Sequence, residues 1–271
     1  MRFKDKVAVI TGGAGVLCSE FGAALAKAGA KVALLDLNEA AARQKAAEIE
    51  KDGGRAIGIG CNVLDTDSVK AAAEKSLGAF GPCDFLINGA GGNNAKGSTE
   101  DETFGAGGKT FFDIDPKWFG FVFELNLLGT VIPTQVFAGQ MLGREGGAIL
   151  NISSMSAPCP MTKVPAYSAA KAGISNLTQW LAVYFAESKI RVNAIAPGFL
   201  ITGQNKTLLM NGDGSLTDRS RKILSHTPMR RFGQPSDLIG AVKFLLDGSE
   251  SGFINGVVLP IDGGFMAYSG V

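Results

Sequence analysis

Short apolar segments alternate with stretches of helical spacing along almost the whole chain. The apolar segments lie near residues 6–11, 31–36, 55–60, 83–88, 147–152, 190–195 and 256–260, and the helical stretches lie near 17–28, 39–51, 66–79, 116–141, 166–187 and 235–247. Segments such as KVALLD and GAILNI are apolar at nearly every position, as in parallel strands that helices cover on both faces. This alternation predicts an α/β fold, a single doubly wound Rossmann domain with a parallel sheet of about seven strands.

Two segments interrupt this alternation, residues 91–114 and roughly 199–228. Both follow strands at the carboxyl edge of the predicted sheet, where ligands bind in such folds. Long connections in a compact domain are often lids or binding loops. We therefore expect one domain over residues 1–271, with an insertion at about 91–114 and a lid at about 199–228 that closes over a bound substrate.

The composition favours a small molecule as the partner. The formal net charge is +1, so no overall field attracts nucleic acid or an anionic membrane surface. Four scattered cysteines and a single histidine provide too few ligands for a metal site. The amino terminus enters a strand pattern without an apolar leader, and no stretch approaches the ~18 uninterrupted apolar residues of a membrane span. We expect a soluble, cytoplasmic protein that binds neither nucleic acid nor a membrane.

The sequence TGGAGVLC at residues 11–18 lies between the first predicted strand and the first predicted helix. Unpaired N–H groups at a helix N-terminus attract phosphate when side chains do not shield the backbone. Gly12, Gly13, Ala14 and Gly15 leave that backbone open, although such turns also occur as plain connections. The loop alone is therefore compatible with a pyrophosphate site or with a structural turn.

Asp36 ends the second predicted strand, 24 residues after Gly12. A carboxylate near this offset binds the adenosine ribose hydroxyls of a dinucleotide. It would repel a 2′-phosphate, which favours NAD over NADP. Asp36 would also suit a turn or a helix cap, and S-adenosylmethionine-dependent methyltransferases share this layout. A nucleotide-binding regulator without catalysis is a further alternative.

Tyr167 and Lys171 lie four residues apart in a predicted helix, which places both on one face. A phenol with a pKa of about 10 is a poor base at neutral pH, and a neighbouring ammonium lowers that pKa. The strand GAILNISS brings Ser154 to the carboxyl edge, where its hydroxyl is able to bond a substrate oxygen. Asn126 lies in an apolar helical stretch, where an amide requires hydrogen bonds, and it would suit a bound water or a kink. Together these residues indicate proton transfer.

Six motifs, in order and at suitable spacing, resemble the short-chain dehydrogenase/reductase family: TGGAGVLC, NGAG at 88–91, Asn126, ISS at 152–154, YSAAK at 167–171 and PGFLIT at 197–202. The resemblance implies an NAD-dependent enzyme acting on CH–OH groups. In that family Tyr167 would be the general acid/base, and Lys171 would lower its pKa and bind the nicotinamide ribose. Ser154 would orient the substrate and Asn126 would hold a proton-relay water. Three residues separate Tyr167 from Lys171, which resembles the alcohol–ketone enzymes rather than the enoyl reductases.

The same resemblance implies the cofactor contacts. They are Gly12, Gly13, Ala14, Gly15, Val16 and Leu17 in the first loop, Asp36 and Leu37 after the second strand, Asn62 and Val63 near the adenine, Asn88, Gly89, Ala90 and Gly91 on the adenosine side, Tyr167 and Lys171, and Pro197, Gly198 and Thr202 near the carboxamide. Val16 and Cys18 stand where the family pattern TGxxxGxG has glycine, so side chains replace a backbone that tolerates positive φ. We expect a reshaped loop that still binds the cofactor.

Polar residues near the predicted site indicate the substrate. Asn93, Asn94 and Lys96 follow NGAG, and Lys163 lies between Ser154 and Tyr167. Amides and a lysine suit a hydroxylated, anionic substrate such as a sugar acid, although solvated surface lysines are equally ordinary. We expect Lys163 to bind the carboxylate and Asn93 and Asn94 to bind the hydroxyls, with Ser154 and Tyr167 at the reacting carbon.

The motifs GGAGVLC and NGAGGNN and the long insertion also resemble the short-chain-type D-mannonate oxidoreductases (fructuronate reductases). Other sugar-acid or polyol dehydrogenases, such as gluconate 5-dehydrogenases, are the alternative. The family resemblance further implies a homodimer or homotetramer built through the helices near 116–141 and 166–187 and the last strand. His226 is expected to face solvent or to pack rather than to act in catalysis, and the pair Arg230-Arg231 is expected to form surface ion pairs.

Overall fold

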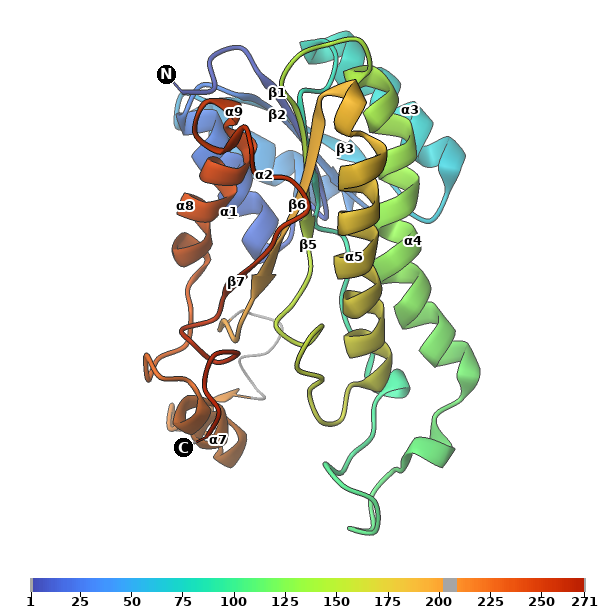
Figure 1. Ribbon diagram of the computed structural model, residues 1–271, viewed down its shortest axis with the longest axis vertical. Helices are drawn as coiled ribbons and strands as arrows, with labels where there is room; N and C mark the ends of the chain where they lie inside the picture. Colours follow the sequence, from blue (N-terminus) through green and yellow to red (C-terminus); the bar gives the residue numbers. More distant parts are fainter. Residues whose placement is uncertain (1, 202–208, 271) are drawn as a thin grey trace.

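The computed structural model describes residues 2–201 and 209–270 (Figure 1). Strands and helices alternate as the sequence predicts. The strands are β1 (Val7–Thr11), β2 (Lys31–Asp36), β3 (Arg55–Gly60), β4 (Phe85–Asn88), β5 (Gly147–Ile152), β6 (Ile190–Pro197) and β7 (Val258–Ile261). The longer helices are α1 (Val16–Lys27), α2 (Glu39–Lys51), α3 (Thr66–Phe80), α4 (Pro116–Met141), α5 (Pro165–Tyr184), α7 (Asp218–His226) and α8 (Pro235–Leu246), and the short helical turns are η1 (Ala95–Gly97), η2 (Phe111–Asp113), η3 (Ala186–Ser188) and α9 (Gly248–Ser251).

The seven strands form one parallel sheet in the order β3-β2-β1-β4-β5-β6-β7. The chain moves outward from β1 to β3 and then returns to β4 on the other side of β1. Where the strand order reverses in this way, the loops that leave the two central strands diverge and form a crevice that binds ligands. The predicted doubly wound fold is confirmed.

Helices cover both faces of the sheet (Figure 1). The core on one face includes Phe21 of α1, Ile49 of α2 and Leu238 of α8, and the core on the other face includes Val69 of α3 and Phe137 of α4. Successive residues of a strand point to opposite faces, so β1 contributes to both cores. This is why the strand segments are apolar without alternation.

The helix α4 carries Asn126 and is long enough to span a membrane. Asp115 caps its N-terminus by accepting a hydrogen bond from the Lys117 N–H, and Pro116 occupies the first turn. By length and composition alone, α4 is the one helix in residues 2–201 and 209–270 that would be able to cross a membrane. It packs against α3, α5 and β4, which accounts for the apolar residues on its buried side, whereas Phe121 and Leu128 are exposed.

The two long connections lie at the carboxyl edge of the sheet, at the end of the molecule that also holds the C-terminus (Figure 1). Residues 91–114 contain η1 and η2, and residues 199–228 contain α7, a helix that the sequence prediction missed. The Thr217 hydroxyl caps α7 by accepting a hydrogen bond from the Ser220 N–H at 3.2 Å. Residues 202–208 of the predicted lid lie outside the described residues.

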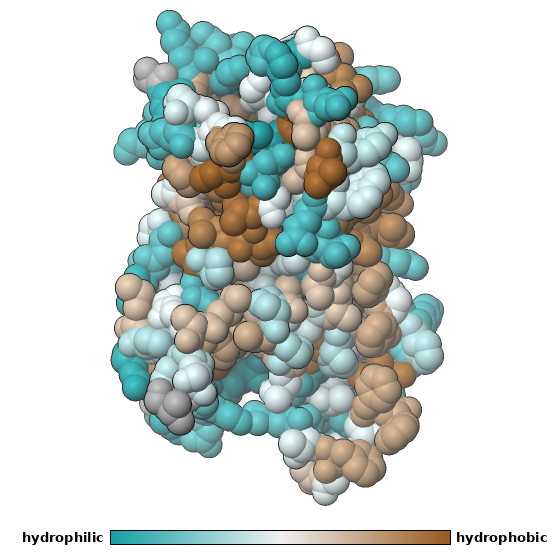
Figure 2. Space-filling view, viewed as in Figure 1, coloured by the Kyte–Doolittle hydropathy of each residue, from teal (hydrophilic) through white to brown (hydrophobic). Residues whose placement is uncertain are grey.

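An aromatic cluster formed by Phe104, Phe111 and Phe112 is exposed on the first of these connections. Its rings pack edge to face, with centroids 5.9 and 6.2 Å apart. Figure 2 shows apolar side chains on this projecting segment and also over the edge strand β7. Exposed apolar surface of this kind is typical of contacts between protein chains.

Candidate active site

Tyr167, Ser154 and Lys171 come together where β5 ends and α5 begins. Pro165 occupies the first turn of α5, and the helical geometry places Lys171 Nζ 5.5 Å from the centre of the Tyr167 ring. The Ser154 hydroxyl is hydrogen-bonded to the Tyr167 phenol. The Lys171 ammonium donates to the carbonyl oxygen of Ile152 at 2.8 Å. The structure therefore groups three residues that the sequence only suggested as a set.

Burial changes the acid–base behaviour of both titratable groups. It raises the pKa of the Tyr167 phenol, and the hydrogen bond with Ser154 acts in the opposite direction. Burial also lowers the pKa of the Lys171 ammonium to about 8, so this side chain is still cationic at neutral pH. The sequence predicts that Lys171 lowers the tyrosine pKa. In the structure the interaction with Ser154 lowers it, and the effect of Lys171, whose ammonium donates to the Ile152 carbonyl, stays a prediction.

Asn126, in the middle of α4, holds the loop that follows β4. Its amide donates to the carbonyl oxygens of Val122 and Gly92, each at 2.7 Å, and its Oδ1 accepts from the Gly92 N–H at 3.1 Å. A Cβ on Gly91 would lie 2.6 Å from this Oδ1, so the close approach requires glycine. The buried amide is thus bonded to the main chain beside Lys171, and its proton-relay water stays a prediction.

A cleft of about 360 Å³ lies at the carboxyl ends of β1, β2 and β4, where the strand order reverses. We call it the cofactor cleft. Most of the predicted cofactor contacts line it, namely Gly12, Gly15, Val16, Leu17, Asp36, Leu37, Asn62, Val63, Gly89, Ala90 and Gly91. Cys18, Cys61, Leu125 and Ile152 complete the lining and were missed as cleft residues by the sequence reasoning, because each is an ordinary apolar core residue by type.

The first loop leaves backbone N–H groups available for a phosphate. The 12-residue helix α1 begins after Gly15, and no side chain caps its N-terminus. Gly12 has a φ of 64°, and a Cβ there would lie 3.0 Å from the backbone of Ala90, so glycine is required at this position. An uncapped helix end provides N–H groups and a partial positive charge for a pyrophosphate. The residues present therefore fit a dinucleotide.

Gly13 and Ala14 shape this loop and do not line the cleft. The Gly13 N–H donates to the Leu35 carbonyl at 2.9 Å, and a Cβ on Gly13 would lie 2.7 Å from Leu34. The Ala14 N–H donates to Asp36 Oδ2 at 3.1 Å. The Asp36 carboxylate thus ties the loop to the end of β2 while it also lines the cleft, so its turn role and its predicted cofactor role are compatible.

Asn88 is another predicted cofactor residue that does not line the cleft, and neither do Tyr167, Lys171, Pro197 and Gly198. The Asn88 amide is buried and donates to Asn151 Oδ1 at 2.8 Å and to the Thr134 hydroxyl at 2.9 Å. These bonds join β4 to β5 and α4, so the Asn88 side chain supports the sheet beneath the cleft, and its cofactor contact stays a prediction. Thr202 lies outside the described residues.

A second cavity, of about 320 Å³, lies beside Tyr167 and Ser154. We call it the substrate cavity. It joins the cofactor cleft at Leu17 and Ile152, which line both. Much of its wall is apolar, formed by Met155, Met161, Val164, Phe199, Leu200 and Leu209. The predicted carboxamide contacts Pro197 and Gly198 also line it.

The polar side chains that line the substrate cavity differ in part from the predicted ones. Asn93 lines it as expected, together with Ser153 and Ser154. Arg219 of α7 also lines it and was missed by the sequence reasoning. Thr217 caps the helix that carries Arg219, and this capping residue is the sequence signal for the helix. It lies within the segment that the sequence analysis predicts to be a lid.

Lys163 and Asn94 are not among the residues that line the substrate cavity. Lys163 has a left-handed backbone with a φ of 72°, and its carbonyl accepts from the Thr99 N–H at 2.9 Å. Its ammonium contributes to the lowered pKa of the Glu102 carboxyl, whose main cause is a hydrogen bond from Lys222. Asn94 caps η1 through its side-chain oxygen, which is therefore already engaged. The predicted carboxylate and hydroxyl contacts of these two residues lack support from this geometry.

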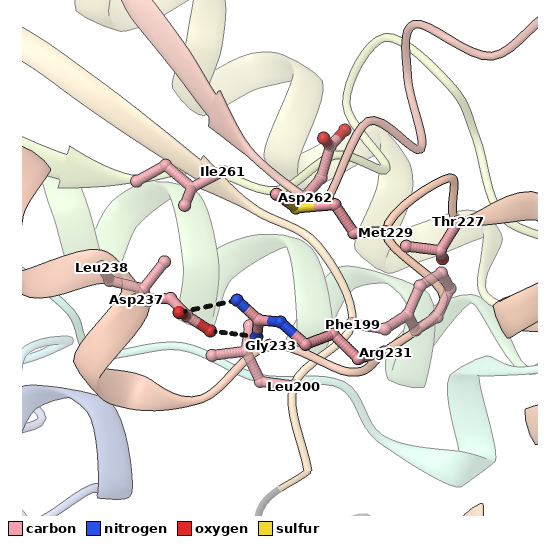
Figure 3. Close-up of a pocket in the computed structure, with 11 residues that line it drawn as sticks. Phe199, Leu200, Thr227, Met229, Arg231, Gly233, Asp237, Leu238, Ile261 and Asp262 are labelled. Carbon is pink, nitrogen blue, oxygen red and sulfur yellow. Dashed lines mark hydrogen bonds and ion pairs between the residues drawn. The ribbon is translucent and has the colours of Figure 1, made fainter.

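A third cavity, of about 220 Å³, lies between the ends of β6 and β7 and the start of α8, and its lining residues are drawn in Figure 3. Arg231 and Asp237 form two hydrogen bonds there, at 2.6 and 2.9 Å, which lower the pKa of Asp237 to about 2. The predicted ion pair is confirmed for Arg231. Arg230 instead donates to the carbonyl oxygens of Leu224 and Ser225.

The sequence is similar to several known proteins. It matches the family described as Enoyl-(Acyl carrier protein) reductase over residues 17–266. An uncharacterized oxidoreductase of Haemophilus influenzae is 54% identical, over 100% of this chain and 96% of that protein. A crystal structure of a Haemophilus protein provisionally named a D-mannonate oxidoreductase, with bound NAD, is 53% identical and has a TM-score of 0.96, covering 100% of this chain and 98% of that one.

Relatives at lower identity carry other substrates in their names. The 7α-hydroxysteroid dehydrogenase of Escherichia coli is 33% identical over 97% of this chain and 95% of its own length. The 2-dehydro-3-deoxy-D-gluconate 5-dehydrogenase of Formosa agariphila is 34% identical over 98% of this chain and 95% of its own length. These matches decide against a methyltransferase or a noncatalytic regulator. The chain belongs to the short-chain dehydrogenase/reductase family of oxidoreductases, which act on CH–OH groups.

Proposed function

We propose that the protein is an NAD(H)-dependent oxidoreductase that interconverts a secondary alcohol and a ketone on a sugar acid, D-mannonate and D-fructuronate. The observation that carries the proposal is the junction at Leu17 and Ile152 between the cofactor cleft and the substrate cavity. This junction allows a dinucleotide and a small substrate to meet beside Tyr167. The bound NAD in the 53% identical Haemophilus structure supports the choice of cofactor.

When bound, NAD(H) supplies the hydride transfer, and the side chains of the protein manage the proton. In the direction of reduction, Tyr167 donates its phenolic proton to the carbonyl oxygen of the ketone. Its raised pKa keeps the phenol protonated at neutral pH, which suits this direction. Ser154 orients the same oxygen by hydrogen bonding. In the direction of oxidation, the phenolate accepts the proton of the alcohol, and the nearby Lys171 ammonium stabilises the negative charge.

The lining of the two sites supports a proposed position for each part of the dinucleotide. The N-terminus of α1 would bind the pyrophosphate, and Asp36 would bind the adenosine ribose hydroxyls and repel a 2′-phosphate. Lys171 would bind the nicotinamide ribose, and Pro197 and Gly198 would lie at the carboxamide. A Cβ on Gly198 would lie 2.6 Å from the Asp262 backbone, so the turn at this place requires glycine.

Polar groups in the substrate cavity support a sugar acid. One N–H of the Asn93 amide donates to the Ser98 hydroxyl, which leaves its oxygen and second N–H for hydroxyl groups of a substrate. No acidic residue of the described chain lines this cavity, so a carboxylate meets no like charge there. The names of the Haemophilus and Formosa proteins also refer to sugar acids. Another sugar-acid or polyol dehydrogenase, such as a gluconate 5-dehydrogenase, is the alternative. The apolar part of the wall makes apolar ketones a necessary control.

We also propose a cytoplasmic homodimer or homotetramer. Phe121 and Leu128 of α4 and Trp180, Val183 and Tyr184 of α5 are exposed although they are large and apolar. These two helices pack against each other, so their exposed residues are suited to bury a shared face in an assembly. The four free cysteines suit a reducing compartment.

Rates of NADH oxidation across a panel of ketones test the proposal. The panel contains D-fructuronate, other keto-acid sugars, neutral ketoses and apolar ketones. The expected result is the highest kcat/KM with D-fructuronate, and a higher value with NADH than with NADPH. A higher kcat/KM with neutral or apolar ketones would overturn the sugar-acid assignment but not the alcohol–ketone chemistry.

A further inference from the structure

Arg219 lies at the boundary between the substrate cavity and a neighbouring cavity of about 230 Å³. We call the second one the outer cavity. It is lined in part by Glu102, Lys222 and His226, and it shares Arg219, Met161 and Phe199 with the substrate cavity. Arg219 is the one cationic side chain of the described residues that lines the substrate cavity itself.

Charges near this boundary are unbalanced. Glu102 is the one acidic residue, among those described, that lines either cavity, and it is ion-paired with Lys222. Lys163 and Arg219 add to the effect of Lys222 in lowering the pKa of the Glu102 carboxyl. One carboxylate therefore stands among three cations. The excess positive charge favours an anion at the entrance of the substrate cavity.

Arg219 differs from other arginines nearby because it forms neither a hydrogen bond nor an ion pair with residues 2–201 or 209–270. Arg221, on the same helix, is paired with Asp218. Arg231, in the cavity of Figure 3, is paired with Asp237. A partly exposed guanidinium without an acidic partner is available to an incoming carboxylate, whose two oxygens match its fork of N–H donors.

The backbone that carries Arg219 is held in place on both sides. The Thr217 hydroxyl caps the helix at Ser220, and the Ser220 hydroxyl donates to the Leu209 carbonyl at 2.5 Å. Ile223 is buried one turn further along the helix. A side chain that projects from such a fixed backbone loses less conformational freedom when it binds a ligand.

We propose that Arg219 binds the carboxylate of the substrate and makes the enzyme select an acid over the corresponding neutral ketone. The inference rests on the proposed function and assigns its specificity to one residue. The reacting carbonyl lies at Tyr167 and the carboxylate lies at Arg219, so the acid spans the cavity with its hydroxyls toward Asn93. Lys163 then acts only through its charge at a distance.

Kinetics of Arg219→Met and Arg219→Lys with D-fructuronate and with D-fructose, its neutral counterpart, test this inference. In Arg219→Met, kcat/KM for D-fructuronate should fall roughly 10- to 150-fold, the effect of losing a hydrogen bond to a charged group. The change should appear mainly in KM, and kcat/KM for D-fructose should stay within about twofold of its original value. Arg219→Lys keeps the charge but lacks the planar guanidinium. Its kcat/KM for D-fructuronate should therefore lie between that of the unmodified protein and that of Arg219→Met.

Two matched controls separate a specific contact from general charge. Arg221→Met removes an arginine two residues away on the same helix. Lys163→Met removes the lysine that the sequence analysis expects to bind the carboxylate. Both should change the preference for the acid by less than about threefold, within the range of a surface charge. The NADH affinity and the unfolding temperature of each variant report whether the fold is intact.

Four results would overturn one or both assignments. An unchanged acid preference in both Arg219 variants, or a loss confined to Lys163→Met, would overturn the inference and leave the proposed function standing. A protein that shows no preference for any keto acid over neutral ketones before mutation would overturn the proposed function and the inference together. If Arg219→Met does not fold, Arg219→Lys with an unchanged KM for D-fructuronate is sufficient to refute the contact.

Discussion

The Cys18 thiol occupies the space beside Gly89 in which a side chain at residue 89 would have to fit. A Cβ on Gly89 would lie 2.1 Å from Cys18 Sγ and 2.9 Å from the Thr11 carbonyl oxygen. Cys18 is buried on α1, and burial raises the pKa of its thiol to about 12, so it acts as a packing group. Cys18, which stands where the family pattern has glycine, thus packs against Gly89 in the loop after β4.

This contact predicts coupling between the two positions. Gly89→Ala should lower the free energy of unfolding by about 1–3 kcal/mol, because the added methyl overpacks a dense site. Adding Cys18→Ala should reduce that cost by at least about 0.5 kcal/mol, since the sulfur no longer meets the methyl. Urea unfolding of both single variants and the double variant measures the coupling. Gly92→Ala is the control, because a Cβ at Gly92 meets open space. If the changes in unfolding free energy of the Cys18 and Gly89 variants simply add in the double variant, the contact is contradicted.

Asp36→Asn and Asp36→Ala separate the two roles of this carboxylate. Asn keeps an oxygen that accepts from the Ala14 N–H but removes the charge that repels a 2′-phosphate. Both variants should therefore lower the ratio of kcat/KM with NAD to that with NADP by roughly tenfold or more, about 1.4 kcal/mol. Asp36→Ala should also weaken NAD binding, because the loop loses an anchor. An unchanged ratio of kcat/KM with NAD to that with NADP in both variants would show that Asp36 does not contact the adenosine.

Tyr167→Phe should abolish turnover and leave NADH binding nearly intact. The phenolic proton is needed only in the chemical step, and loss of a general acid typically costs at least ~100-fold in rate. Steady-state rates and a fluorescence titration with NADH measure the two properties. Tyr184→Phe, at an exposed tyrosine at the end of the same helix, should keep full activity. A Tyr167→Phe rate above about a tenth of the original would contradict the assigned role.

Lys171 should make stability depend on pH. Its pKa is about 8 in the folded protein and 10.5 ordinarily, so between these values the unfolded chain binds a proton that the folded chain does not. The contribution of Lys171 to the free energy of unfolding is therefore constant below pH 8. It rises with pH up to about 10.5, by about 3 kcal/mol in all. Urea unfolding across this range should show the rise, and Lys171→Met should lose it. Lys75→Met, at an exposed lysine of α3, should retain it.

The exposed face of α4 and α5 predicts a mass above that of the monomer at micromolar concentration. Val183→Glu places a charge in this face and should shift the protein toward smaller species, because burying an unpaired charge is costly. Leu77→Glu, at an exposed leucine of α3, is the control and should leave the mass unchanged. Analytical ultracentrifugation checks both. A strictly monomeric mass for the unmodified chain would refute the assembly.

The sheet, the first loop and the pairing of Tyr167 with Lys171 were predictable because they depend on patterns close together in the chain. Helices on both faces of a parallel sheet require strands that are apolar throughout, so KVALLD coincides with β2. Four residues make about one helical turn, so Tyr167 and Lys171 share a face whatever surrounds them. The capping pair Asp115 and Pro116 likewise marked the start of α4.

Only the tertiary structure decided which distant residues share a cavity and what environment each side chain meets. Arg219 follows Tyr167 by 52 residues and lies on a short helix whose apolar residues are Ile223 and Leu224, yet both line the substrate cavity. Asn88 belongs to a cofactor motif, but partners on β5 and α4 bond its amide beneath the cleft. Burial by several elements together sets the pKa values of Tyr167 and Lys171. Local patterns arise from backbone periodicity, whereas cavities and desolvation arise from packing between elements, which no short stretch of sequence contains.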